Sequence, residues 1–345
     1  MATQKILAVA VGNDLDLDGV TQSQLSGLRP ILQHLVAGLR ARFGYELNNQ
    51  YALDYRQGIP TLRPGKPGTL LAKLKAYLEG PKPDVVFTIA SRATIDAVDA
   101  RRQANRESVP IVFTVISEPA SDNNKNLVDG HTMMGNQITG VSTSLVQNVL
   151  TFRDLLNEFQ DRDGRQFEAH CISQAAFHPA AHASRRQLDY HSHPRLPHRH
   201  HDLETVDGSE IAGVIKALNP YAPDRRPCLL VIPSDAMFAF RDVVIAEAHA
   251  RGIPTFFQQP ECVQDVSDPK KSAVAAYGLP PETIGWEAAD CVQKVLQNPG
   301  DASRLPVRFP RNFEFWVNTT VASRLGLTLT PEGRRLASRI FAPPT

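Results

Sequence analysis

The sequence lacks the short motifs that mark most cofactor sites and many catalytic sites. No Gly-x-Gly-x-x-Gly follows the first apolar segment, and no Gly-x-x-x-x-Gly-Lys-Ser/Thr segment occurs, so dinucleotide and P-loop folds lose their main support. The zinc-protease motif His-Glu-x-x-His is absent, and residues 140–144 miss the second glycine of Gly-x-Ser-x-Gly. Because no nucleophile and base stand out together, we expect a protein that is not an enzyme and needs no cofactor.

An excess of one charge, paired cysteines and long apolar runs are missing too. The 37 Lys and Arg residues nearly balance the 36 Asp and Glu residues, so a net charge of +1 gives no global field for nucleic acid or an anionic membrane. None of the four cysteines forms a Cys-x-x-Cys pair, which predicts buried or free thiols. No apolar run approaches the roughly 20 residues of a membrane span. We expect neither a nucleic-acid partner nor membrane insertion.

The first residues carry no recognisable export signal. Residues 1–5 lead directly into the apolar run 6–11, which is shorter than the core of a signal peptide with its cleavage region. As given, the chain fits a mature or trimmed form of an exported protein, or a cytosolic protein.

What the sequence does contain is an alternation of short apolar runs and helical stripes. Its 345 residues, 42% of them apolar, are comfortable for two globular domains. Strands separated by single helices imply right-handed crossovers and parallel sheets, and thus an α/β fold. The first half predicts strands at 6–11, 45–55, 84–90 and 109–116, and helices at 28–43, 69–78 and 94–103.

The alternation restarts after the polar stretch 118–136, where we expect the chain to change lobes. Gly44 is well placed to end the first helix. The second half predicts strands at 138–142, 167–172, 202–206, 229–232, 254–257, 273–277 and 312–317, and helices at 145–159, 211–218, 236–252, 284–295 and 331–340. Two such halves suggest two α/β lobes facing one cleft.

Polar residues at the strand ends are the candidate ligand-binding residues. In an open parallel sheet, ligands bind beyond the carboxyl ends of the strands, beside the following helix N-termini. Ser91 and Thr94 could hold a carboxylate there, and Asp235 could orient a cationic or hydroxylated ligand. Each has a plainer alternative, such as helix capping, a solvated loop acid or hinge packing. The remaining candidates are Ser117, Glu118, Ser142, Thr143, Ser234 and Tyr277.

Eight of the eleven histidines lie between residues 170 and 201. On a strand, His198 and His200 would share one face, a spacing that suits a metal ion. Prolines punctuate this stretch and arginines interrupt it, which favours a solvent-exposed loop. We therefore predict no metal site.

A set of segments in fixed order resembles the substrate-binding proteins of ABC transporters, a family that includes binders of aromatic amino acids. The likeness runs from about residue 84 to the C-terminus. The segments are PDVV at 83–86 with Ala-Ser at 90–91, IVFTVISEP at 111–119, ITGVS at 138–142, LVIPSD at 230–235, GIP at 252–254, YG at 277–278, LPV at 305–307, NFEFWVN at 312–318 and LGL at 325–327.

This resemblance implies a type I periplasmic-binding fold, with two Rossmann-like lobes of parallel sheets flanked by helices and a three-segment hinge. We expect one lobe to comprise residues 1–116 and 279–305, and the other residues 117–278 and 306–345. The family's ligand residues lie in strand-end loops, here around Asn13, Ser91, Ser117, Ser142, Ser234, Asp235 and Tyr277.

The resemblance also implies a small-molecule ligand, ABC permease subunits as partners if the protein is exported, and a periplasmic or extracytoplasmic location. Arg92 follows the usual small residue and would favour an anionic ligand if it faced the cleft, while Glu118 stands where an aspartate is common. The histidine-rich stretch replaces what is normally an ordinary helix and strand. Our leading hypothesis is a solute-binding protein that closes on an amino-acid-like or other polar metabolite. The alternative is an intracellular sensor with the same fold, which signals to a protein partner.

Overall fold

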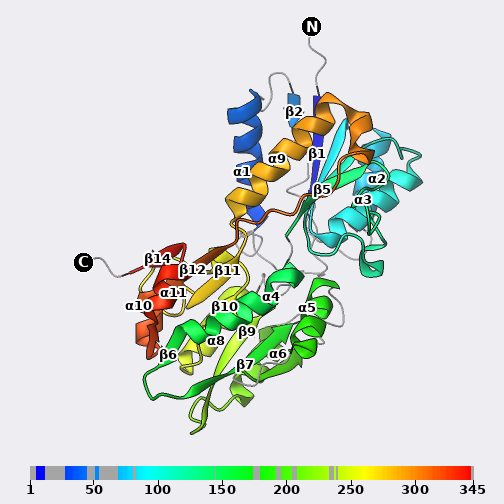
Figure 1. Ribbon diagram of the computed structural model, residues 1–345. Helices are drawn as coiled ribbons and strands as arrows, with labels where there is room; N and C mark the ends of the chain where they lie inside the picture. Colours follow the sequence, from blue (N-terminus) through cyan, green and yellow to red (C-terminus); the bar gives the residue numbers. More distant parts are fainter. Residues whose placement is uncertain are drawn as a thin grey trace. The chain divides into compact units, whose positions relative to one another are not determined.

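A computed structural model describes most of the chain and divides it into two compact units. The first comprises Met1–Ser144 and Pro281–Arg311, and the second Leu145–Pro280 and Asn312–Thr345, so the chain passes between the units three times. Each unit is described by itself below (Figure 1). The described residues are 5–11, 28–44, 51–53, 69–80, 83–143, 145–173, 179–191, 196–203, 208–232, 237 and 240–342.

The first unit is built on a five-stranded parallel sheet in the order β2-β1-β3-β4-β5. Strand β3 is buried along its whole length, as expected for a β-branched run covered on both faces. Because all the strands are parallel, their carboxyl ends meet at one edge of the sheet. The strands are β1 (Lys5–Val11), β2 (Tyr51–Leu53), β3 (Val85–Ile89), β4 (Ile111–Ile116) and β5 (Ile138–Ser142).

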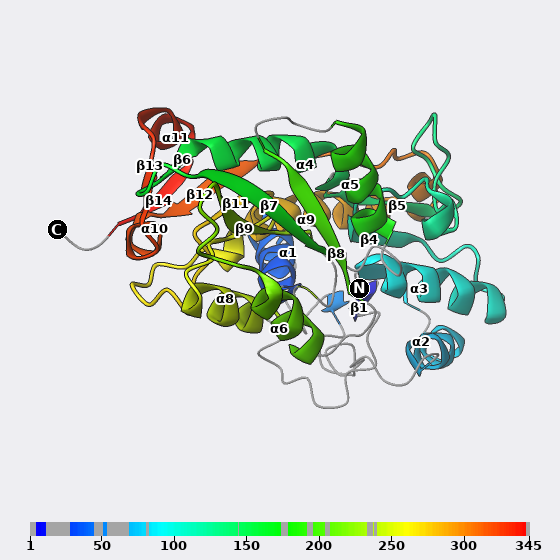
Figure 2. The ribbon, with the colours of Figure 1, turned by 90° about the horizontal axis from the view of Figure 1, so that it is seen from below.

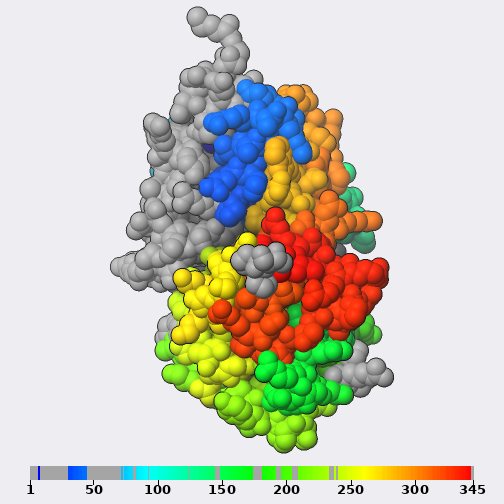
Figure 3. Space-filling model, turned by 90° about the vertical axis from the view of Figure 1, so that its left-hand side faces the viewer, coloured from blue at the N-terminus to red at the C-terminus, as the bar shows by residue number. Residues whose placement is uncertain are grey.

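Within the described residues, four helices accompany this sheet: α1 (Leu28–Phe43), α2 (Thr69–Glu79), α3 (Ser91–Gln103) and α9 (Pro281–Gln297). Short 3-10 turns occur at Asp122–Asn124 and Pro299–Ser303. Helix α1 ends at Gly44, whose φ of 69° is the left-handed conformation that glycine adopts most easily, as predicted. Figure 3 shows α1 in blue directly beside α9 in orange.

The second unit contains a seven-stranded sheet in the order β14-β12-β11-β10-β9-β7-β8. Its neighbours pair in parallel, except that β12 runs antiparallel to β11. Strands β6 (Phe159–Asp161) and β13 (Leu327–Leu329) form a separate antiparallel pair. The seven strands are β7 (Gln166–Ser173), β8 (His198–Asp202), β9 (Arg225–Val231), β10 (Thr255–Phe257), β11 (Ala275–Gly278), β12 (Glu314–Asn318) and β14 (Arg339–Phe341).

Two apolar clusters fill the two faces of this second sheet. Residues of α4 and α5 pack with Ala169 and Cys171 of β7 on one face, whereas residues of α6 and α8 pack with Ile172 on the other. Figure 2 shows these helix pairs on opposite sides of the strands. The helices are α4 (Leu145–Asp154), α5 (Pro179–Tyr190), α6 (Gly208–Ala217), α8 (Arg241–Ala250), α10 (Thr319–Arg324) and α11 (Pro331–Leu336), with 3-10 turns at Leu155–Glu158 and Pro260–Cys262.

The division into units differs from the expected one. The sequence suggested a first crossing after residue 116, but β5 pairs with β4 from Ile111 opposite Ile138 to the end of the strand. This pairing keeps the polar stretch and β5 in the first unit, which extends to Ser144. The second and third crossings fall at 280/281 and 311/312, a few residues later than expected.

Several element predictions were wrong in detail. The histidine-rich stretch is not a loop, because it forms α5 and the edge strand β8, and the strand expected at 202–206 is instead His198–Asp202. Helix α3 begins at Ser91, three residues earlier than predicted. The last predicted helix stops at Leu336, and residues 339–341 pair with β12 as a strand.

The four cysteines are free and buried, which confirms the prediction from their spacing. Burial raises the pKa of the Cys171 thiol to about 12 and that of Cys291 to about 11, so both stay protonated at neutral pH. Across the described residues, no helix combines the length and hydropathy that a bilayer crossing requires.

His249 makes the stability of the second unit depend on pH. Its Nε2 lies 2.8 Å from Oγ1 of Thr255, and its Nδ1 contacts the carbonyl of Pro269. Burial lowers the pKa of His249 to about 4. As the pH falls through about 6.5, the unfolded chain binds a proton at His249, whereas the folded protein does not bind it until about pH 4. The free energy of unfolding therefore decreases as the pH falls through that window. We expect the free energy of unfolding to drop by up to about 2 kcal/mol between pH 7 and pH 5 from this residue.

Urea unfolding of the His249→Gln variant at both pH values tests this expectation. The variant should lose stability at pH 7 but show a smaller difference between the two pH values than the unmodified protein. His182→Gln is the matched control, since His182 is exposed on α5. An unchanged pH dependence in His249→Gln would show that another group carries the effect.

Candidate functional site

Four of the predicted hydroxyl residues lie at the carboxyl edge of the first sheet. Ser91 follows β3, Ser117 follows β4, and Ser142 and Thr143 end β5 and follow it. Because β3, β4 and β5 are neighbours in the sheet, residues more than 50 positions apart meet along one edge. All four are buried, with exposures between 0% and 9%.

The structure joins the ends of β4 and β5 through these side chains. Oγ of Ser117 lies 3.3 Å from Oγ1 of Thr143, and Oγ of Ser142 donates to the carbonyl of Ser117 at 3.4 Å. The backbone N–H of Ser142 donates to the carbonyl of Arg308. A hydroxyl donates one hydrogen bond and accepts two, so Ser117 and Thr143 keep capacity for a further polar group.

Thr94 has a different role from the one expected. Its Oγ1 lies 2.7 Å from Oγ1 of Thr88 and donates to the carbonyl of Ala90 at 3.0 Å, and the residue is fully buried. The hydroxyl therefore stabilises the junction of β3 and α3 from within. Ala90 makes that junction sharp with a φ of 78°, unusual for a residue other than glycine. Ser91 becomes the first helical residue of α3, at the end where backbone N–H groups attract acceptors.

Glu118 stands at the same edge, half-buried after β4. Its carbonyl accepts hydrogen bonds from Oγ of Ser121 at 2.8 Å and from Nδ2 of Asn124 at 2.7 Å. These contacts anchor the start of the loop that leads to β5. The backbone of Glu118 thus has a structural role.

Tyr277 lies in the second unit, on β11. Its ring stacks on Phe313, with centroids 5.6 Å apart and planes inclined by 29°, and it packs against the core that includes Phe315. The side chain is half-buried, and burial raises the pKa of its hydroxyl. Packing therefore orders this ring. Of the other predicted site residues, Asn13, Ser234 and Asp235 lie outside the described residues, as does the side chain of Arg92.

A polar pair at the carboxyl edge of the second sheet was not predicted. Oγ of Ser173, the last residue of β7, donates to Oδ1 of Asp202 at 3.1 Å, and Arg185 of α5 forms an ion pair with the other carboxylate oxygen. Ser173 follows a buried apolar run in the same way as Ser117, so the pattern used for the first unit would have found it. The same pattern would not have found Asp202. The predicted strand at 202–206 begins at this residue, whereas β8 ends there.

Comparisons with known proteins identify the fold. No model of a known family and no curated protein matches the sequence. An ABC domain from Streptococcus pneumonia in complex with L-Trp is 15% identical, with a TM-score of 0.72 over 98% of this chain and 100% of that one. A conserved domain protein from Vibrio cholerae is 19% identical, with a TM-score of 0.68 over 99% and 100%. An ABC transporter solute binding protein from Agrobacterium vitis with bound allitol is 14% identical, with a TM-score of 0.56 over 97% and 98%.

These matches span nearly the whole of each chain and confirm the predicted fold class. The protein has the α/β fold of the ABC transporter solute-binding proteins, with parallel sheets flanked by helices. At such low identity the likeness concerns architecture.

Proposed function

We propose that this protein is the solute-binding component of an ABC importer. The observation that carries the proposal is the row of buried hydroxyls at one sheet edge, in a fold whose solved relatives hold small molecules. Such proteins bind a ligand and pass it on without changing it, in agreement with the absence of catalytic motifs. ABC permease subunits are the proposed partners, and an extracytoplasmic location follows from the same proposal.

The proposed ligand is a small polar metabolite, and the carboxyl edge of the first sheet supplies part of its binding site. Ser117 and Thr143 offer hydroxyls to a hydroxylated or carboxylated compound, and the first turn of α3 offers backbone N–H groups. Asp235 is assigned to an amine or a ring hydroxyl, and Arg92 to an anionic group. Of the ligands named for similar structures, L-Trp carries a carboxylate and allitol carries hydroxyls, and either group could accept hydrogen bonds from such an edge.

Thermal unfolding in the presence of candidate ligands tests this function. We expect at least one amino acid, sugar or polyol to raise the melting temperature, because a ligand at 100 times its Kd stabilises the folded protein by about 2.7 kcal/mol. The screen should include L-Trp and allitol. If no small molecule shifts a correctly folded sample, the solute-binding function is wrong.

Variants of the hydroxyl edge test whether this edge is the binding site, separately from whether the protein binds a solute. Ser117→Ala and Thr143→Ala should each weaken binding of the ligand found by the screen about 2- to 10-fold, the effect of one neutral hydrogen bond. Thr328→Ala, the same change at the exposed middle residue of β13, should leave the Kd unchanged. If all three variants bind equally well, solute binding stands but this edge is not the site.

A further inference from the structure

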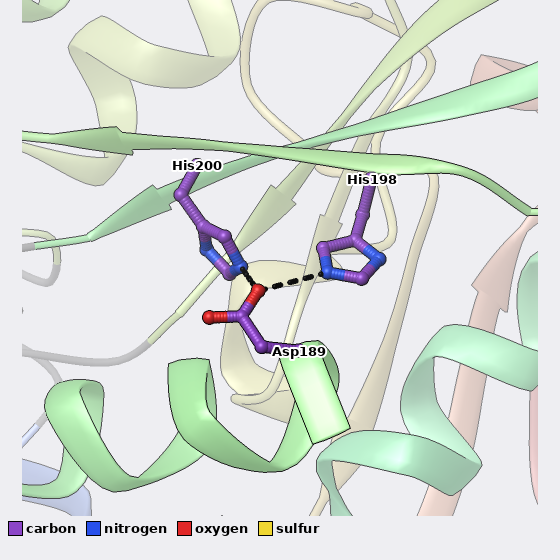
Figure 4. A group of neighbouring side chains, drawn as sticks. All are labelled: Asp189, His198 and His200. Carbon is purple, nitrogen blue, oxygen red and sulfur yellow. Dashed lines mark hydrogen bonds and ion pairs between the residues drawn. The ribbon is translucent and has the colours of Figure 1, made fainter. Parts of the chain in front are cut away.

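Three side chains of the second unit converge outside the proposed solute site. His198 and His200 lie two residues apart on β8, so both point to the same face of the strand, toward Asp189 near the end of α5 (Figure 4). Nε2 of His200 lies 2.9 Å from Oδ1 of Asp189, and Nε2 of His198 lies 3.3 Å from the same oxygen. The three potential ligand atoms, one from each residue, all lie within 4.8 Å of one another.

The spacing of these atoms suits a tetrahedral metal ion. Zinc binds imidazole nitrogen and carboxylate oxygen at about 2.0–2.2 Å, so two ligands of a tetrahedral site lie about 3.4 Å apart. The two observed nitrogen to oxygen distances are close to that value. The imidazole rings are already held apart, with centroids 5.1 Å from each other and planes inclined by 78°.

The surroundings hold the three groups in place and leave a path from solvent. The side chains of His198 and His200 are only 9% and 10% exposed, whereas that of Asp189 is 52% exposed. A water molecule can therefore reach the fourth position from the carboxylate side. Nδ1 of His200 is buried with no hydrogen-bond partner among the described residues, so the contact with Asp189 leaves this ring half-satisfied.

The charges nearby are compatible with a cation. Nε of Arg185 lies 3.8 Å from Oδ2 of Asp189, on the other oxygen from the one that faces the histidines. Arg185 is also paired with Asp202, which offsets its charge. Oδ1 is thus left to the two imidazoles.

We propose that Asp189, His198 and His200 form a binding site for a divalent transition-metal ion of the zinc type. Two imidazoles and one carboxylate supply three protein ligands, and water completes the coordination. The ion joins edge strand β8 to helix α5, two elements connected through residues 191–197. This role is independent of solute binding.

Calorimetric titration of the tag-free, chelator-treated chain with zinc chloride tests the proposal. We expect one ion per chain in a single high-affinity transition, and a melting temperature that rises with added zinc. The double variant His198→Gln/His200→Gln should lose this site and the thermal shift. Asp189→Asn is a milder second variant, since its amide oxygen still accepts the two hydrogen bonds, and it should weaken binding at least about 10-fold.

The control is a second pair of histidines, His170 on β7 and His201 on β8. His170 and His201 stack with centroids 5.2 Å apart on the opposite face, and Nδ1 of His170 lies 2.9 Å from Nε2 of His201. His170→Gln/His201→Gln should keep one zinc ion per chain at the original affinity. Absence of binding to the unmodified chain, or binding that survives both His198→Gln/His200→Gln and Asp189→Asn, would overturn the proposal and leave a purely hydrogen-bonded cluster.

Discussion

Replacing Asp161 with asparagine is expected to lower the free energy of unfolding of the second unit by about 3–5 kcal/mol. The Asp161 side chain is 1% exposed, with Oδ1 paired to Arg226 and Oδ2 2.8 Å from Nε of Arg165. Arg226 also donates to the carbonyls of Gly252 and Leu325. The carboxylate therefore joins β6 to Arg226 of β9, and the Arg226 guanidinium reaches the ends of α8 and α10. Without it, the largely buried Arg226 and the nearby Arg165 lose their shared anion.

Asp163→Asn is the matched control for this variant. Asp163 also contacts Arg165, at 3.1 Å, but its side chain is 66% exposed, so the change should cost less than about 1 kcal/mol. Urea unfolding followed by the fluorescence of Trp316, in a Trp286→Phe background, reports on the second unit alone. Similar losses in the two variants would contradict a special role for the buried carboxylate.

Asp161 and His249 both make the protein less stable in acid, but for different reasons: ion pairs with arginines lower the pKa of Asp161, whereas burial lowers that of His249. Burial opposes ionisation of Asp161, but the hydrogen bonds and charges of Arg165 and Arg226 outweigh it and hold the carboxyl pKa below its usual range. Its contribution to stability is complete above about pH 4 and is lost as the pH falls further. The free energies of unfolding of Asp161→Asn and of the unmodified protein, measured as a function of pH, should therefore approach each other below about pH 4. The effect of His249 on this free energy falls between about pH 4 and pH 6.5.

Replacing Gly285 with alanine should destabilise the first unit by about 1–3 kcal/mol, the usual effect of overpacking. A Cβ at this position in α9 would lie 2.5 Å from Cβ of His34 and 2.7 Å from the carbonyl oxygen of Ile31, both in α1. These atoms belong to the backbone or adjoin it, so no side-chain rotation relieves the clash. The gain in helix propensity from glycine to alanine, about 1 kcal/mol, offsets only part of this loss.

Gly300→Ala is the control, because a Cβ there would meet nothing within 4 Å. Its effect should be within about 0.5 kcal/mol, or slightly stabilising through a restricted unfolded chain. In a Trp316→Phe background, Trp286 reports on unfolding of the first unit. A Gly285→Ala variant as stable as Gly300→Ala would show that α1 and α9 are not closely packed.

The strands and helices of the first unit followed largely from local patterns. The run at 84–90 is β-branched and too short for a helix, and the stripe along α1 repeats with a helical period before Gly44 ends it. The edge of hydroxyls could be anticipated in part, since Ser91, Ser117 and Ser142 follow or end such runs. The resemblance to ABC substrate-binding proteins pointed to the same fold.

Local patterns failed where long-range pairing decides the outcome. Nothing near residues 138–142 shows that β5 completes the first sheet, so the lobe boundary was placed too early. The histidine-rich stretch has a polar, proline-interrupted composition, but pairing with β7 turns residues 198–202 into an edge strand. Thr94 was predicted to bind a ligand. Its hydrogen bond to Thr88 depends on how α3 folds back on β3, which the local sequence does not reveal.

The sequence by itself determined the kinds of elements, the parallel α/β architecture and the places where strands end, because periodicity and turn residues act over a few positions. Only the tertiary structure decided which strand ends meet and which polar groups are turned inward. It also brought Asp189 onto the face of His198 and His200. Contacts of that kind depend on how the chain brings distant segments together, which no local pattern records.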